Sequence, residues 1–171
     1  FKNAKTSDIG RMGNLKFKIG EYKMKVLIIG SGGRECALAR KIHQSEQLSQ
    51  LYVTGNNPGF PADSIYIKYD TALIPNSIKH QIDLVVVGPE APLADGIADQ
   101  VRDVGIPVFG PSKQAAQLES SKAYAKSFMM KYDLPTAKYG VFTERHKAIE
   151  YIDGPCVVKA DGLAGGKGVY V

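Results

Sequence analysis

The sequence KVLIIGSGGRE occupies residues 25–35 and decides the fold class of this 171-residue chain. Residues 26–29 are a short, β-branched apolar run without polar alternation, which is typical of a strand buried on both faces. The run ends in a glycine-rich turn, after which Ala37, Leu38 and Ile42 follow at helical spacing. A buried strand that leads through a glycine turn into a helix indicates an α/β protein with a parallel sheet.

The same strand–helix pattern recurs further along the chain. Residues 84–87 form a second strong apolar run that ends at a glycine. The spacing of apolar residues predicts a helix over 93–104, followed by a strand over 107–109. Weaker strands are expected at 51–53 and 65–67, and a short helix that Pro75 opens at 75–81. Over residues 24–110 this alternation predicts a parallel sheet covered by helices on both faces.

The pattern changes after residue 110. Residues 112–132 are expected to be largely helical, and residues 144–152 form a second helix candidate. Strands are expected at 139–143, 156–160 and 168–171. We therefore expect a complete first domain at 24–110 and the truncated beginning of a second at 111–171, with its last strand left unpaired.

Composition excludes several classes of protein. The chain is 44% hydrophobic and 23% charged, as ordinary soluble domains are, and has no apolar run near the roughly 20 residues that span a bilayer. Two distant cysteines, Cys36 and Cys156, give neither a disulfide framework nor a zinc motif, so a reducing cytoplasm is expected. Of the net charge of +5, residues 1–23 carry +4, which leaves no basic face for nucleic acid. Residues 1–23 are interpreted as a leader or tag that contributes little to the core.

The first glycine-rich loop predicts an anion site. Glycines at positions 30, 32 and 33 let the backbone approach a ligand, the following helix offers free N–H groups, and Arg34 suits a phosphate. A nicotinamide fingerprint fails because Glu35 replaces its third glycine, and because residues 51–55 contain no acidic residue for a ribose. A purely structural turn stays an alternative.

A second loop, residues 88–92, follows the other strong strand. Ligands of open parallel sheets bind outside the carboxyl ends of the strands, so we expect both loops to face one crevice. Glu90 would accept a hydrogen bond there from a sugar hydroxyl or an amine, unless it is simply an exposed loop carboxylate. Residues 56–59 either join the rim or form a plain turn.

The third feature is the sequence VVKADGLAGGKGV at residues 157–169. It lacks the first glycine and the final Ser or Thr of a Walker A loop, and a strand rather than a helix follows it. A glycine-rich hairpin can still cover a phosphate, with Lys167 and backbone N–H groups as donors. Lys159 lies in an apolar strand, where we expect an anionic partner. The alternative is a simple hairpin with solvated lysines.

Taken together and in this order, these segments closely resemble the phosphoribosylamine–glycine ligase family of the ATP-grasp superfamily. The resemblance covers residues 24–171. Its most specific segments are 25–35, 83–97, 108–129 and 157–169.

The resemblance implies a Rossmann-like domain at 24–110, the start of an ATP-grasp domain at 111–171, and a reaction. Family members use ATP and Mg²⁺ to join glycine to 5-phosphoribosylamine through an acyl phosphate, giving glycinamide ribonucleotide, ADP and phosphate in purine biosynthesis. The residues that match ATP-binding positions are Lys122, Lys159, Gly165, Gly166, Lys167 and Gly168. Those expected at the phosphoribosyl substrate are Gly32, Gly33, Arg34, Glu35 and Glu90.

The chain departs from the family in three respects. Cys36 replaces the usual histidine, and we expect it to pack as a small apolar residue. Gly165 replaces an alanine of the glycine loop. The chain is also much shorter than a family member, so we assign no catalytic residue and no metal ligand, and we expect the Mg²⁺ ligands outside it and this part alone to be inactive. The expected partners are the small substrates, without nucleic acid or membrane, and the expected state is a monomer.

Two alternatives follow from the missing length. One is another ATP-grasp ligase with a different substrate, and the other is a non-catalytic module that binds a nucleotide or a phosphate.

Overall fold

The computed structural model describes residues 23–165 and 167–171. Of the segment 1–23, interpreted as a leader or tag, only Lys23 is among the described residues. Gly166, predicted to bind ATP, is not among them.

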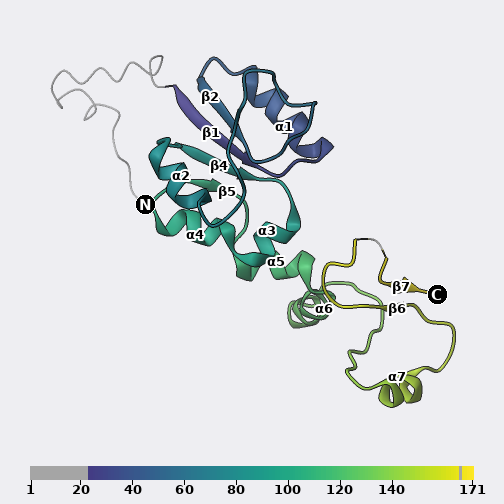
Figure 1. Ribbon diagram of the computed structural model, residues 1–171. Helices are drawn as coiled ribbons and strands as arrows, with labels where there is room; N and C mark the ends of the chain where they lie inside the picture. The colour runs from purple at the N-terminus through teal and green to yellow at the C-terminus, as the bar shows by residue number, and fades with distance from the viewer. Residues whose placement is uncertain (1–22, 166) are drawn as a thin grey trace, which may run out of the picture.

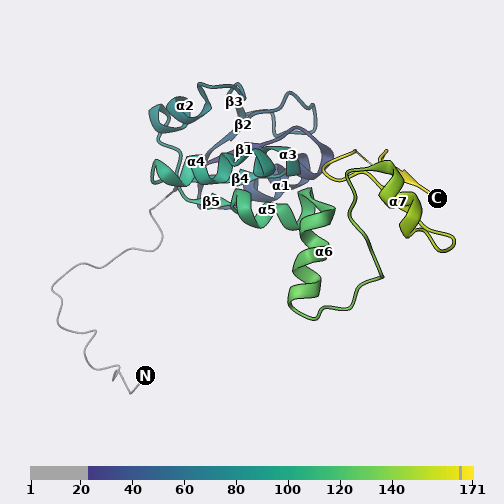
Figure 2. The ribbon, with the colours of Figure 1, turned by 90° about the horizontal axis from the view of Figure 1, so that it is seen from below.

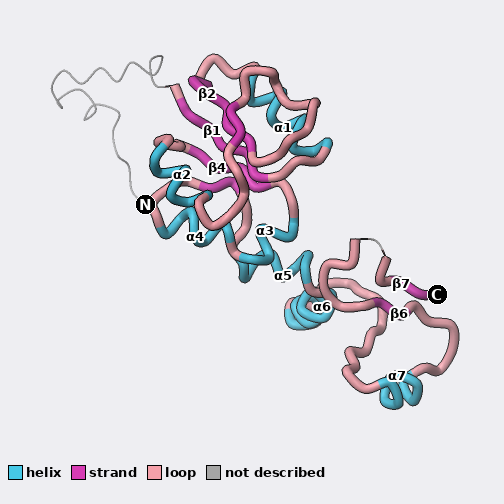
Figure 3. The backbone as a smooth tube through the Cα atoms, viewed as in Figure 1, coloured by secondary structure: helices cyan, strands magenta, loops and turns pink. Residues whose placement is uncertain are grey.

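A five-stranded parallel sheet forms the centre of the first half of the chain (Figures 1 and 3). Its strand order is β3-β2-β1-β4-β5, and every neighbouring pair is parallel, as predicted. The strands are β1 (Met24–Ile29), β2 (Leu48–Val53), β3 (Ile65–Tyr66), β4 (Leu84–Val87) and β5 (Val108–Phe109). Ile29 is opposite Val87 in the register, so the loops that follow β1 and β4 begin side by side.

Alternate residues of the strands build two cores. Leu27 and Ile29 face one core, which helices α2 (Leu73–Lys79), α3 (Glu90–Asp95), α4 (Ile97–Asp103) and α5 (Lys113–Ser120) complete. Val26 and Ile28 face the other, which packs against α1 (Gly33–His43). Both faces of the sheet therefore carry helices, because both sets of side chains are apolar.

Two helices in this half differ from the prediction. The helix expected over 93–104 begins earlier, at Glu90, and Gly96 divides it into α3 and α4 with a φ of +94°. A carboxylate is favourable in the first turn of a helix, and proline is tolerated there, so the proline-rich loop starts a helix instead. Helix α2 begins at Leu73, which places Pro75 inside its first turn rather than at its start.

The second half of the chain extends away from the sheet (Figure 2). Helix α6 (Lys122–Lys131) follows α5 after a break at Ser121, so the largely helical stretch predicted over 112–132 is two helices. Ser121 is extended, and its hydroxyl accepts the N–H of Tyr124 at 3.1 Å, which starts the second helix. Helix α7 (Arg145–Tyr151) precedes the antiparallel pair β6 (Val158–Lys159) and β7 (Val169–Tyr170).

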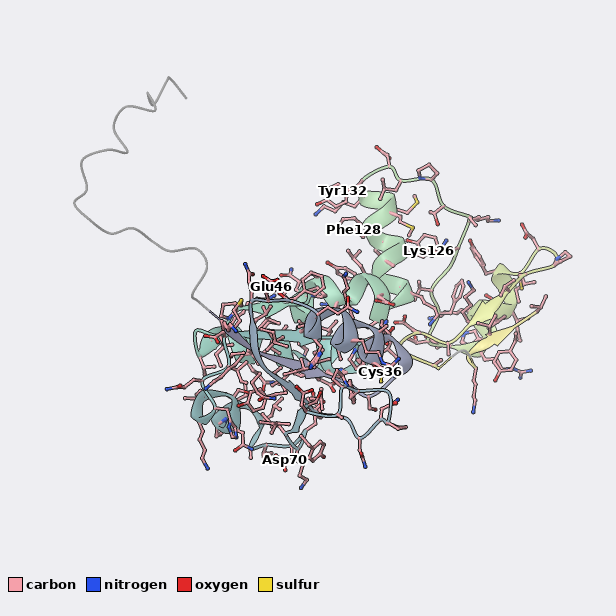
Figure 4. All side chains as sticks on the ribbon, turned by 90° about the horizontal axis from the view of Figure 1, so that it is seen from above. Cys36, Glu46, Asp70, Lys126, Phe128 and Tyr132 are labelled. Atoms are coloured by element: carbon pink, nitrogen blue, oxygen red, sulfur yellow. The ribbon has the colours of Figure 1, made fainter. Side chains whose placement is uncertain are left out.

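The strand predicted over 139–143 is wrong. The Tyr151 hydroxyl donates to the carbonyl of Tyr139 in this segment at 2.9 Å, and just before the segment Lys126, labelled in Figure 4, donates to the Ala137 carbonyl at 3.3 Å. The last strand, expected to be unpaired, pairs with β6.

Candidate functional site

The two glycine loops of the parallel sheet meet at one cleft, as predicted. The cleft has a volume of about 450 Å³. Its lining consists of Ile29, Gly30, Ser31, Gly32, Glu35, Thr54, Tyr69, Pro89 and Pro92. It lies outside the carboxyl ends of β1, β2 and β4, where parallel sheets bind ligands.

Glu35 fills the space beneath both loops. It is 3% exposed, and its Oε2 accepts the N–H of Gly32 at 2.7 Å while its Oε1 accepts from Arg34 Nε at 3.0 Å. A Cβ at Gly88 would lie 2.1 Å from Oε1, and one at Gly30 would lie 2.7 Å from Cγ. Glycine is therefore required at both positions because the Glu35 side chain passes between the loops.

Arg34 joins the two loops on the exposed side. Its Nη1 donates to Glu90 Oε1 at 3.2 Å, and the two side chains are 55% and 39% exposed. This hydrogen bond is the main reason why the pKa of Glu90 lies below its ordinary value and that of Arg34 above it. The pair leaves a guanidinium, a charged group that suits phosphate oxygens, next to the start of α1.

The predicted substrate residues thus fall into two groups. Gly32 and Glu35 line the cleft, whereas Gly33, Arg34 and Glu90 do not appear in its lining. Gly33 is the first residue of α1, and Glu90 the first of α3, so both helices begin at this edge of the sheet.

The sequence analysis missed two residues of the cleft. Thr54 lies directly after β2, and its Oγ1 accepts the N–H of Gly30 at 2.9 Å. Tyr69 lines the same cleft, and burial raises the pKa of its hydroxyl. The position of Thr54 after a predicted strand was the available signal, whereas nothing in the sequence marks Tyr69.

The segment at 56–59 forms a local turn and is hydrogen-bonded to the first loop, but none of its residues is in the lining of the cleft. Asn57 Nδ2 donates to the Ser31 carbonyl at 2.8 Å, which ties the segment to the first loop. Its Oδ1 accepts the N–H of Gly59 at 2.8 Å, which closes a local turn. Cys36, labelled in Figure 4, is 7% exposed, and a Cβ at Gly59 would lie 3.0 Å from its Sγ, so Cys36 packs as predicted.

The glycine-rich segment forms the predicted hairpin. Lys159 pairs with Val169 in the register, and the Ala160 N–H donates to the Gly168 carbonyl at 2.8 Å. Gly162 and Gly165 have positive φ values of +84° and +55°, which side chains rarely adopt. These values explain two of the glycines in the loop.

The predicted lysines lie at different points around this loop. Lys122, at the start of α6, donates from Nζ to the Gly162 carbonyl at 2.7 Å. Lys159 is exposed on β6, so the burial that led us to expect an anionic partner is not observed in the described part of the chain. Lys167 is also exposed, within the loop itself. None of the described residues of this loop is in the lining of the first cleft.

Within residues 23–165 and 167–171, no group of three or more His, Cys, Asp or Glu side chains is placed to hold a metal ion. Among the same residues, no helix is long and apolar enough to cross a bilayer.

The described residues form an α/β fold, in which a five-stranded parallel sheet is followed by a smaller part with an antiparallel hairpin. The structure aligns with an ADP complex of purK, N5-carboxyaminoimidazole ribonucleotide synthetase, with a TM-score of 0.62 and 24% identity, over 86% of this chain and 40% of that one. It also aligns with a biotin carboxylase domain from Hydrogenobacter thermophilus, with a TM-score of 0.69 and 18% identity, over 87% of this chain and 38% of that one.

The chain belongs to the phosphoribosylglycinamide synthetase family. Residues 24–119 match the N domain of that family, and residues 120–171 match its ATP-grasp (A) domain. The chain is 52% identical over 155 residues to phosphoribosylamine–glycine ligase of Brucella melitensis and 50% identical to that of Mesorhizobium japonicum. These alignments cover 86% of this chain and 36% of each relative, so the chain spans little more than a third of their length.

Proposed function

We propose that this chain is the N-terminal part of a phosphoribosylamine–glycine ligase. In its full-length form the protein would join glycine to 5-phosphoribosylamine at the expense of ATP, as a cytoplasmic monomer in purine biosynthesis. The family membership and the names of the relatives support this activity. In this protein residues 24–110 would bind the phosphoribosyl substrate, and residues 111–171 would bind ATP.

The first cleft is proposed to hold the phosphoribosyl substrate. The observation that carries this assignment is the meeting of two glycine loops at one cleft, with Arg34 hydrogen-bonded across to Glu90. Free N–H groups at the start of α1 and a guanidinium beside them suit a sugar phosphate. The N–H groups of Gly33 and Arg34 and the Arg34 guanidinium would bind the phosphate, and Gly32 would let the ligand approach the backbone. Glu90 would accept from a hydroxyl or an amine, and Glu35, which accepts the Gly32 N–H, would hold the loop in place.

The hairpin is proposed to hold the ATP phosphates. Its donor set fits that group, since Gly162 and Gly165 turn the backbone at positive φ and three lysines lie around the loop. Lys122, Lys159 and Lys167 would supply positive charge, and the glycines among residues 165–168 would supply backbone N–H groups, since the Lys167 N–H already donates to the Ala164 carbonyl at 2.9 Å. ATP supplies the energy that activates the glycine carboxylate. The Mg²⁺ ligands are proposed to lie in the part of the relatives that this chain does not match.

Binding of ribose 5-phosphate to the 171-residue chain tests the first assignment. We expect a saturable heat of binding by calorimetry, which ribose without phosphate should not produce. Equal binding of both sugars, or binding of neither, would contradict a phosphoribosyl site.

Turnover tests the complete activity. We expect the full-length protein to release ADP only when glycine and phosphoribosylamine are both present, and the 171-residue chain to release none. The residues of this chain form one side of a site, whereas ligation requires three substrates held together away from water. Glycine-independent ADP release by the full-length protein would point to a different substrate.

A further inference from the structure

Asp161 connects the glycine-rich loop to the start of α6. Its Oδ1 accepts the N–H of Lys122 at 2.6 Å and the N–H of Ala123 at 3.2 Å. The Ser121 hydroxyl donates to Oδ2 at 3.1 Å. The first N–H groups of a helix have no partner within the helix, so a carboxylate from a distant part of the chain completes this one.

A second contact runs in the opposite direction. Lys122 Nζ donates to the Gly162 carbonyl at 2.7 Å. Neighbouring residues of the loop and of the helix therefore exchange hydrogen bonds, and we call this pair of contacts the Asp161–Lys122 clasp.

The clasp holds a loop that would otherwise have wide conformational freedom. Gly162 and Gly165 both occupy the left-handed region, which glycine enters and leaves at little cost. The hydrogen bond from the Ala160 N–H to the Gly168 carbonyl closes the base of the hairpin, but it does not fix where the hairpin lies relative to α6. The contacts between Asp161, Lys122 and Ala123 join the loop to this helix directly.

The Asp161 carboxylate is directed to the helix and not to a ligand. Backbone N–H donors, that of Ala123 foremost, hold the pKa of this carboxyl below its ordinary value, so it stays ionised at neutral pH. A free carboxylate beside a phosphate site would repel the ligand, whereas one whose oxygens accept from the helix N-terminus is largely compensated.

We propose that Asp161 is a positioning residue, which fixes the glycine-rich loop against α6 so that Lys122 and the loop N–H groups form one phosphate-binding surface. This inference rests on the proposed nucleotide role of the hairpin. Asp161 acts through Lys122 and the loop and does not touch the nucleotide.

The experiment measures the clasp and its consequence separately. Amide hydrogen exchange in the 171-residue chain reports the clasp at Lys122 and Ala123, and calorimetry with ADP in the full-length protein reports the phosphate site. Asp161→Ala should speed exchange of these two amides about tenfold or more and weaken ADP binding about tenfold, since charge-assisted hydrogen bonds are lost. Asp161→Asn should be intermediate in both measurements, because its amide oxygen can still accept.

Asp153→Ala is the matched control. Asp153 is an exposed carboxylate of the same half of the chain, paired with Lys138 at 3.1 Å. This control should leave both measurements unchanged.

Faster amide exchange together with weaker ADP binding in the Asp161 variants supports the positioning role of Asp161. Unchanged exchange overturns the clasp, and faster exchange with unchanged ADP affinity reduces Asp161 to a helix cap, which overturns the positioning role alone. A full-length wild-type protein that binds no ADP overturns the proposed nucleotide site, and the role of Asp161 with it.

Discussion

The two regions of the chain, residues 24–119 and residues 120–171, differ in how far their apolar side chains are buried. The first region buries 21 hydrophobic residues, and all of them except Cys36 belong to two cores on either side of a parallel sheet. In the second region no described hydrophobic side chain is buried, and large ones such as Val141, Ile149 and Tyr170 are 58%, 54% and 68% exposed.

This difference in burial indicates which interactions stabilise the conformation of each region. Packing of β-branched side chains defines the first, because removal of apolar surface from water is the main source of stability. Hydrogen bonds between polar side chains and the backbone define the second, as at Asp161 and Lys122. The apolar residues there are half-buried or exposed, and some form aromatic pairs, such as Phe128 on α6 with Tyr132 directly after it (Figure 4).

The largest difference should appear on truncation of an apolar side chain in each region. Leu27 has no exposed surface, and Leu27→Ala should lower the free energy of unfolding by about 2–5 kcal/mol because it leaves a cavity. Ile149→Ala, at an exposed position of α7, should change it by less than about 0.5 kcal/mol. Urea denaturation measures both, and equal losses would show that the second region contributes to the same core.

Arg34 should matter for ligand binding and little for the fold. Its guanidinium is half-exposed, and a charge-assisted contact to phosphate contributes about 1.5–3 kcal/mol. Arg34→Ala should therefore weaken binding of ribose 5-phosphate by roughly 10–150-fold, as measured by calorimetry. Arg145→Ala, in α7 of the second region, is the control and should leave the affinity unchanged. An unaltered affinity in the Arg34 variant would remove the guanidinium from the proposed site.

Replacing the glycine at position 88 by alanine should lower the free energy of unfolding, whereas the same replacement at position 154 should not. Gly88→Ala brings a Cβ within 2.1 Å of Glu35 Oε1 and should destabilise the protein by about 1–3 kcal/mol. Gly154→Ala adds a methyl where nothing lies within 4 Å and should be close to neutral. Thermal unfolding measures both, and a neutral Gly88→Ala would mean that Glu35 leaves its place without loss.

The smallest expected effect is a shift in one titration. The hydrogen bond from Arg34 lowers the pKa of Glu90 below its ordinary value of 4.5. The stabilisation from this pair is therefore present above that value and is lost as pH falls through the lowered pKa. Arg34→Ala should raise the pKa of Glu90 toward 4.5. Carboxyl chemical shifts followed by NMR would report it, and a Glu90 pKa that does not move would show that Arg34 is not its partner in solution.

The sequence predicted the first region well and the second less well, for a physical reason. Continuous apolar runs identify buried parallel strands because both faces of each strand are covered, and residues 26–29 and 84–87 carry that signal without ambiguity. Residues 139–143 have the composition of a strand, but four of the five are exposed and no described strand pairs with them. Local propensity is a weak guide where no packing supports it.

The sequence alone determined the sheet, the two glycine loops at its edge, the glycine-rich hairpin and the family resemblance, since each depends on residues close together in the chain. Only the tertiary structure decided which groups meet across the chain. It placed Glu35 beneath Gly88, Arg34 against Glu90, and Asp161 on the first turn of α6. These contacts join residues tens of positions apart, and strand register and loop path fix them, neither of which a local pattern specifies.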